Sequence, residues 1–197
     1  MKKSVKTSNL KNNTMKKIIT LLSLVAMTAA HAQGTLIINN YSAYDFYGHV
    51  LAFNMSAPCY PRVSNIDPIT VPANSHTGNG NQLQYDNYRD QFTSSLYPQA
   101  MWTVSDSPNV TNNKPWNDFQ LAPGGTYSTN TKWGLAKFGM VYPGTHNNVP
   151  NFSVNIAVAG NPCYNSPVDY TTPNGANYTN IFTITSGGTS ITYLQIY

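Results

Sequence analysis

Short apolar runs separated by turn-forming residues recur along the chain. The clearest run is 152–159, in which Phe152, Val154, Ile156 and Val158 alternate with small or polar residues. Alternation with a period of two is typical of a β-strand that has one buried and one exposed face. Comparable runs predict further strands at 34–40, 45–55, 66–71, 100–105, 116–121, 132–141, 178–185 and 189–197.

About nine or ten short strands with turn signals between them predict an all-β protein. The expected fold is a single-domain antiparallel β-sandwich of the jelly-roll or immunoglobulin-like kind. The last two strands would form a hairpin across the glycine-containing turn 186–188. In the second strand, we expect Leu51, Phe53 and Met55 to form the buried face. The composition agrees, because residues 33–197 contain no glutamate and few lysines, while strand-forming and turn-forming residues are plentiful.

The first 32 residues have the features of a targeting segment. A basic start at 15–17 precedes a short apolar run at 18–30 and a small-x-small cleavage site at 30–32. We therefore interpret 15–32 as a signal peptide that is cleaved near Ala32-Gln33. Translation would start at Met15, which makes 1–14 a non-native extension. The apolar run is too short to cross ~30 Å of hydrocarbon, so we expect no transmembrane helix. The domain 33–197 would be secreted, to the periplasm or the extracellular space.

Removal of this segment reverses the charge of the protein. The whole chain has a formal net charge of +4, but residues 33–197 contain five basic residues against seven aspartates, which leaves −2. A net negative domain without a basic patch cannot neutralise phosphates. We therefore expect no nucleic-acid partner.

Cys59 and Cys163 are the only cysteines. Each stands in a Pro-Cys-Tyr triplet that follows a predicted strand, and an exported protein meets an oxidising environment. The sequence therefore predicts a disulfide between Cys59 and Cys163. Such a bridge requires a Cα–Cα separation of roughly 4.4–6.8 Å.

No pattern in the sequence indicates an enzyme. Glycosidase chemistry needs two carboxyls on opposite sides of a sugar bond, and the closest aspartates, Asp86 and Asp90, are more typical of a solvated loop. The histidines His49, His76 and His146 do not have the spacing of metal ligands, and a Gly-x-Ser-x-Gly nucleophile motif is absent. We predict no catalytic residue and no metal site.

The most polar stretch, 76–90, predicts a long exposed loop. Binding residues often lie on loops that a rigid scaffold holds, and tyrosine rings beside amides suit a sugar. Calcium would also find oxygen ligands here, although the EF-hand spacing is absent, and we expect no other cofactor. The candidate ligand-binding residues are Asn79, Asn81, Tyr85, Asp86, Asn87, Tyr88 and Asp90. The tryptophans, in contrast, are expected in the core: Trp102, Trp116 and Trp133.

Three segments of the sequence resemble known proteins: the Thr-Leu-Ile-Ile-Asn-Asn opening at 35–40, the Val-Pro-Ala-Asn-Ser turn at 71–75 and the last strand. Together with the signal peptide, they resemble small secreted β-sandwich proteins of Bacteroidota-type bacteria. The opening and the aromatic content are also loosely similar to aegerolysin-like lipid binders. Neither resemblance implies a catalytic residue.

These observations favour a secreted, non-enzymatic protein that binds a glycan or a cell-surface protein. A secreted hydrolase is one alternative. A membrane-active or outer-membrane β protein is another, because Ile191, Tyr193, Gln195 and Tyr197 alternate up to a terminal aromatic residue.

Overall fold

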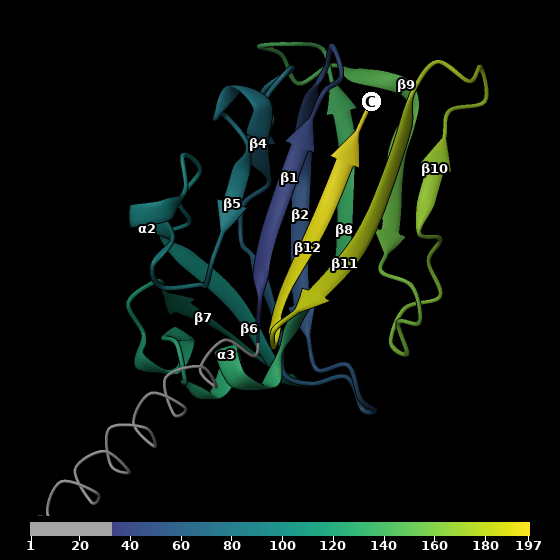
Figure 1. Ribbon diagram of the computed structural model, residues 1–197. Helices are drawn as coiled ribbons and strands as arrows, with labels where there is room; N and C mark the ends of the chain where they lie inside the picture. The colour runs from purple at the N-terminus through teal and green to yellow at the C-terminus, as the bar shows by residue number, and fades with distance from the viewer. Residues whose placement is uncertain (1–32) are drawn as a thin grey trace, which may run out of the picture. The chain divides into compact units, whose positions relative to one another are not determined.

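Residues 33–197 form a sandwich of two β-sheets in the computed structural model, which describes this part of the chain (Figure 1). The prediction of an all-β sandwich with one disulfide is confirmed. The predicted extension at 1–14, the signal peptide at 15–32 and its cleavage site fall outside the described residues.

Sheet A contains five strands in the order β10-β11-β12-β1-β5. Its centre is the predicted hairpin of β11 (Tyr178–Ser186) and β12 (Thr189–Ile196), beside which β1 (Thr35–Asn40) runs parallel to β12. This parallel pair departs from the purely antiparallel arrangement that we expected. The short strands β10 (Asp169–Thr171) and β5 (Leu83–Tyr85) form the two edges.

Sheet B contains seven strands in the order β7-β6-β3-β2-β8-β9, with β4 paired to β2. The two long central strands are β2 (Asp45–Phe53) and β8 (Lys132–Val141). The described residues thus form twelve strands, which is more than the nine or ten that we expected. The additional strands are short and leave no recognisable periodicity in the sequence. The remaining strands of sheet B are β3 (Arg62–Asn65), β4 (Ile69–Val71), β6 (Met101–Ser107), β7 (Val110–Pro115) and β9 (Asn148–Ala157).

Short helical segments connect some of the strands. The strand predicted at 116–121 is wrong, because this stretch contains the 3₁₀ helix η3 (Phe119–Leu121). The Asp118 side chain accepts a hydrogen bond from the Gln120 N–H at 2.8 Å, which stabilises the first turn of that helix. The other segments are η2 (Thr77–Asn79), α2 (Gln91–Ser94) and α3 (Thr126–Asn130).

An aromatic cluster fills the core between the sheets. Trp102 and Trp133 pack against Tyr85 and Tyr88, with ring centroids 5.1–6.1 Å apart. The Trp102 indole N–H donates to the Tyr88 carbonyl oxygen at 3.2 Å, and the Tyr88 hydroxyl lies 2.8 Å from Thr131 Oγ1. Large rings whose polar ends find partners stabilise a core strongly. The expectation that Trp102 and Trp133 are buried is therefore confirmed. The same expectation for Trp116 is wrong, because Trp116 is only half-buried and packs against the exposed ring of Phe92.

The predicted buried face of β2 is only partly right. Val50 and Ala52 point into the main core, whereas Leu51 and the fully buried Phe53 pack on the opposite face. A β-bulge at Gly134 on β8 shifts the register here, so that Leu51 pairs with Leu135 but Ala52 pairs with Trp133. Phe53, Leu135 and Ala157 form a second, smaller apolar cluster, against which Leu51, Met55, Cys163 and Tyr164 pack. Both faces of β2 are apolar near its end, so the sequence pattern alone could not show which face points into the main core.

Gly48 in β2 leaves room for the close approach of β8. A Cβ atom at Gly48 would lie 2.4 Å from Phe138 Cβ and 2.5 Å from the Lys137 carbonyl oxygen. We expect Gly48→Ala to lower the free energy of unfolding by about 2 kcal/mol, because backbone atoms would have to move. Urea denaturation measures the change.

A matched control is available on β8. A Cβ atom at Gly139 would meet no atom closer than 3.7 Å. Gly139→Ala should change the free energy of unfolding by less than about 0.5 kcal/mol. Equal losses in the two variants would contradict the packing that we describe.

The predicted disulfide is present. Cys59 and Cys163 have a Cα–Cα separation of 5.8 Å, and 104 positions separate them in the sequence. The bridge links the segment after β2 to the segment after β9. It therefore anchors the turn that follows β9 over the second apolar cluster.

Candidate functional site

The stretch 76–90 is not the exposed loop that the sequence predicted. It contains η2 and the edge strand β5. Tyr85 and Tyr88 are fully buried in the aromatic cluster, so the prediction that their rings contact a ligand is wrong. Burial raises the pKa of both hydroxyls well above the ordinary value. These two tyrosines hold the sheets together.

The other candidate residues of this stretch mostly stabilise turns. The buried Asn87 accepts hydrogen bonds from two backbone N–H groups and donates to Asp90 at 2.9 Å. The Asp86 carboxylate accepts from Gln84 at 2.8 Å. Asn79 and Asn81 are exposed, but β5 separates them from Asp86, Asn87 and Asp90 along the chain. The structure therefore does not unite the seven residues in one surface.

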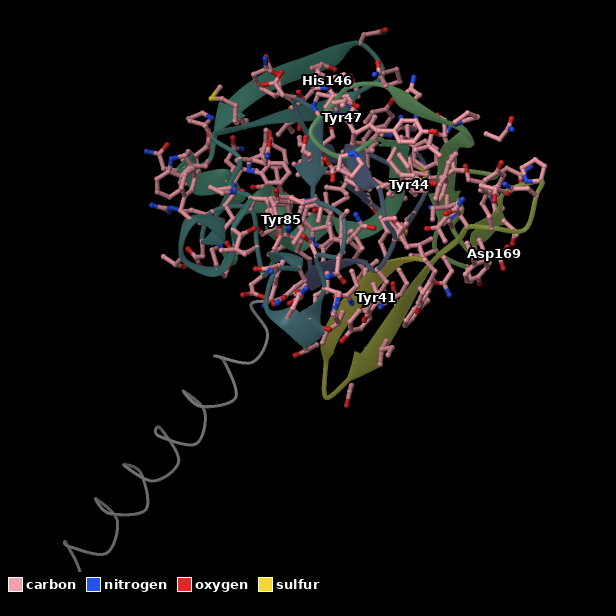
Figure 2. The ribbon with its side chains drawn as sticks, turned by 90° about the horizontal axis from the view of Figure 1, so that it is seen from above. Tyr41, Tyr44, Tyr47, Tyr85, His146 and Asp169 are labelled. Atoms are coloured by element: carbon pink, nitrogen blue, oxygen red, sulfur yellow. A yellow bond between two sulfur atoms is a disulfide. The ribbon has the colours of Figure 1, made fainter. Side chains whose placement is uncertain are left out.

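The histidines lie in three different surroundings. His49 Nδ1 is 3.1 Å from Asn65 Nδ2, His76 stacks on Tyr41, and His146 packs edge-on against Tyr47. Figure 2 shows Tyr47 and His146 together, away from Tyr41. Within residues 33–197, no group of three His, Cys, Asp or Glu side chains is placed to hold a metal ion.

The outer face of sheet A is a more extensive candidate site. Figure 1 looks onto this face, and no helix lies across it. Leu194 and Ile38 point into the core, so their neighbours along β12 and β1 project outward. Asn180 pairs with Gln195, and Gln195 pairs with Asn39. Outward side chains of three strands therefore fall into rows that cross the sheet, about 6.6 Å apart along the strands.

One row consists of stacked rings, and we call Tyr178, Tyr197, Tyr41 and His76 the tyrosine row. The ring centroids of Tyr41 and Tyr197 are 5.3 Å apart with an interplanar angle of 8°. Tyr41 also stacks on His76 at 4.5 Å, and Tyr197 on Tyr178 at 6.1 Å. The exposed fraction is 40% for Tyr41 and 50% for Tyr197. The stacked rings therefore stand upright on the sheet and present their edges and hydroxyl groups to solvent.

The next row consists of amides, and we call Asn180, Gln195 and Asn39 the amide row. The carbonyl oxygens Asn180 Oδ1 and Gln195 Oε1 are buried and have no hydrogen-bond partner among the described residues. Asn39 Oδ1 accepts from the Thr77 N–H at 2.8 Å. A buried amide oxygen without a partner costs free energy. The amide row therefore has hydrogen-bonding capacity that the fold does not use. Asn39 is buried as well, so a ligand reaches these amides only when neighbouring side chains on the face move.

The third row is apolar, and we call Phe182, Tyr193 and Ile37 the apolar row. Phe182 pairs with Tyr193, and their rings stack at 5.4 Å, while Tyr193 pairs with Ile37. Beyond it, Ile184 pairs with Ile191 and continues the apolar surface. The amide row thus lies between two rows that contain aromatic rings.

Charge is absent from the centre of this face. The strands β1, β11 and β12 contain no charged residue. Asp86 follows the edge strand β5. Asp169 begins the opposite edge strand β10, and Figure 2 shows Asp169 at the margin of the molecule. The face therefore suits an uncharged ligand.

The sequence contained a signal for part of this site. The alternation of Ile191, Tyr193, Gln195 and Tyr197 correctly places these four side chains on one face. The rows themselves could not be predicted, because they depend on the parallel pairing of β1 with β12 at the far end of the chain.

A cleft of about 420 Å³ opens at the turn end of the β11–β12 hairpin. Hydroxyl side chains of the hairpin line one side of it, and Lys132 and Trp133 line another. The turn 158–162, which the disulfide anchors, completes the wall. This volume is within the range of small-molecule sites.

No family model, no curated protein and no solved structure matches this chain. Among residues 33–197, no helix has the length and apolar character needed to cross a bilayer.

Proposed function

We propose that the protein is a secreted, non-enzymatic binding protein whose ligand is a neutral glycan chain on the outer face of sheet A. The observation that carries this proposal is the amide row between the tyrosine row and the apolar row. Sugars present apolar C–H faces and hydroxyl groups close together. The edges of the stacked rings and the apolar row would contact the former, and the tyrosine hydroxyl groups and the amides would bind the latter.

The absence of charge favours a glycan over the other ligands. An anionic membrane surface or an acidic polymer would require cations, and β1, β11 and β12 contain none. The arginine and lysines of the strands lie in sheet B instead: Arg62, Lys114, Lys132 and Lys137. A metal-dependent hydrolase has no supporting observation, because the described residues contain no group of three His, Cys, Asp or Glu side chains that could hold a metal ion.

The unused amides provide a sharp test. Gln195→Met keeps the size of the side chain but removes an oxygen that has no partner in the fold. We expect this variant to be at least as stable as the wild type. We also expect it to bind a neutral polysaccharide about tenfold more weakly, a loss of about 1.4 kcal/mol. Affinity electrophoresis on xylan, laminarin and mannan measures binding, with alginate as the charged comparison.

Tyr197→Ser should weaken the same interaction about tenfold, since it interrupts the tyrosine row. Matched controls away from sheet A are Gln120→Met and Tyr142→Ser, and both should bind as the wild type does. The proposal fails if none of the neutral polysaccharides is retained or if the controls lose as much as the sheet A variants. Binding to lipid vesicles instead, abolished by Tyr197→Ser, would favour a membrane-active protein.

A further inference from the structure

The cleft at the turn end of the β11–β12 hairpin contains polar groups that the fold leaves unsatisfied. Gln33 and Trp133 both line this cleft, and their exposed fractions are 3% and 2%. Gln33 Oε1, Gln33 Nε2 and Trp133 Nε1 have no hydrogen-bond partner in the described part of the chain. An indole N–H and an amide that are buried without partners are costly. These atoms lie inside the wall of the cleft, so a ligand in the cleft reaches them only when the side chains around them move.

The hydroxyl groups of the hairpin present a defined pattern to the cleft. Thr192 Oγ1 donates to the Trp133 carbonyl oxygen at 3.3 Å. Its single proton is then used, so Thr183 must be the donor in the 2.9 Å hydrogen bond between Thr183 and Thr192. Thr183 Oγ1 consequently remains free only as an acceptor. A ligand at this position must therefore donate a hydrogen bond, as a hydroxyl group does.

The wall opposite the hairpin is held rigidly. Asn161 Nδ2 donates to the Gly134 carbonyl oxygen at 3.2 Å, and Asn161 Oδ1 accepts from the N–H groups of Cys163 and Tyr164. The disulfide fixes the same turn to the segment that follows β2. The Asn161 side chain thus fixes the position of this wall of the cleft.

The charge of the cleft points to an anion. Lys132 carries the only side-chain charge among the described residues that line it, and an ammonium group only donates hydrogen bonds. Trp133 Nε1 and Gln33 Nε2 are further donors without partners. Donors together with one cation suit a carboxylate, whereas Thr183 requires a hydroxyl donor.

We propose that this cleft is a second binding site, for one small hydroxylated carboxylate of the uronic acid class. It lies at the end of the hairpin opposite the tyrosine row and uses different residues, so the proposal does not depend on the neutral glycan. Lys132 pairs with the carboxylate, and Thr183 accepts a hydrogen bond from a ring hydroxyl. The buried Trp133 indole lies next to the cleft and reports on its occupation.

The test is a titration of the purified protein with D-glucuronate, followed by ¹H–¹⁵N NMR at the Trp133 indole and at the Thr183 amide. We expect saturable shifts at both groups. D-glucose, which lacks the carboxylate, and acetate, which lacks the hydroxyls, should each bind about tenfold more weakly or not at all.

Two variants test the assigned roles. Lys132→Met should weaken glucuronate binding about tenfold, whereas Lys137→Met, on the same strand but outside the cleft, should leave it unchanged. Thr183→Val should weaken glucuronate binding but not acetate binding. Unchanged spectra with glucuronate, equal losses in the two lysine variants, or equal affinity for acetate and glucuronate would each overturn the proposal.

Discussion

Replacement of Cys59 and Cys163 together by alanine should lower the free energy of unfolding by about 4 kcal/mol. The bridge closes a loop across 104 positions, and the chain-entropy model gives about 4.7 kcal/mol for a loop of roughly that size. A domain of ordinary stability has only about 5–15 kcal/mol in total. The disulfide would therefore contribute a large share of the stability of this protein.

Urea denaturation of the oxidised wild type and of the double variant measures this loss. Reduction of the wild type should lower the midpoint to that of the double variant, and the double variant should not respond to the reductant. A difference of less than about 1 kcal/mol would mean that the packing around Tyr164 and Phe53, and not the covalent link, holds the turn in place.

The protein should also lose stability steeply above pH 10. Burial raises the pKa of the Tyr85 and Tyr88 hydroxyls. The pKa of Tyr127 is raised to about 12 by burial and, in addition, by the Asp106 carboxylate beside its hydroxyl. Below pH 10, all three hydroxyls are protonated in both states. Above it, the unfolded chain loses these protons while the folded chain keeps them, so the free energy of unfolding falls as the pH rises.

The slope is about 1.4 kcal/mol per pH unit for each buried tyrosine, hence about 2.8 kcal/mol per unit for Tyr85 and Tyr88 together. Urea denaturation between pH 9 and pH 12 measures it. Tyr88→Phe should halve the part of the slope that Tyr85 and Tyr88 contribute together. A stability that stays constant over this interval would contradict the burial of these hydroxyls.

Local patterns were sufficient to predict the fold class. The alternation in β9, the glycine turn of the last hairpin and the two cysteines depend on neighbouring residues or on simple pairing, and all three predictions are confirmed. A strand with one apolar face leaves a period of two in the sequence wherever it pairs.

The rest depended on contacts between distant segments. The core face of β2 was misassigned because the second apolar cluster, under the disulfide-anchored turn, makes its other face apolar too. Tyr85 and Tyr88 look like loop residues because asparagines and aspartates surround them, but those polar side chains satisfy turns while the rings fill the core. The amide row appears only once β1 is placed beside β12.

Ligand binding by sheet A is tested most directly by a ¹H–¹⁵N shift map of the protein titrated with a soluble xylan fragment or, if xylan is not bound, with the neutral polysaccharide that is. We expect shifts centred on Tyr41, Asn180, Gln195 and Tyr197, with the side-chain amide signals of Asn180 and Gln195 among the largest. Shifts confined to sheet B or to the stretch 76–90, with these amide signals unchanged, would contradict it.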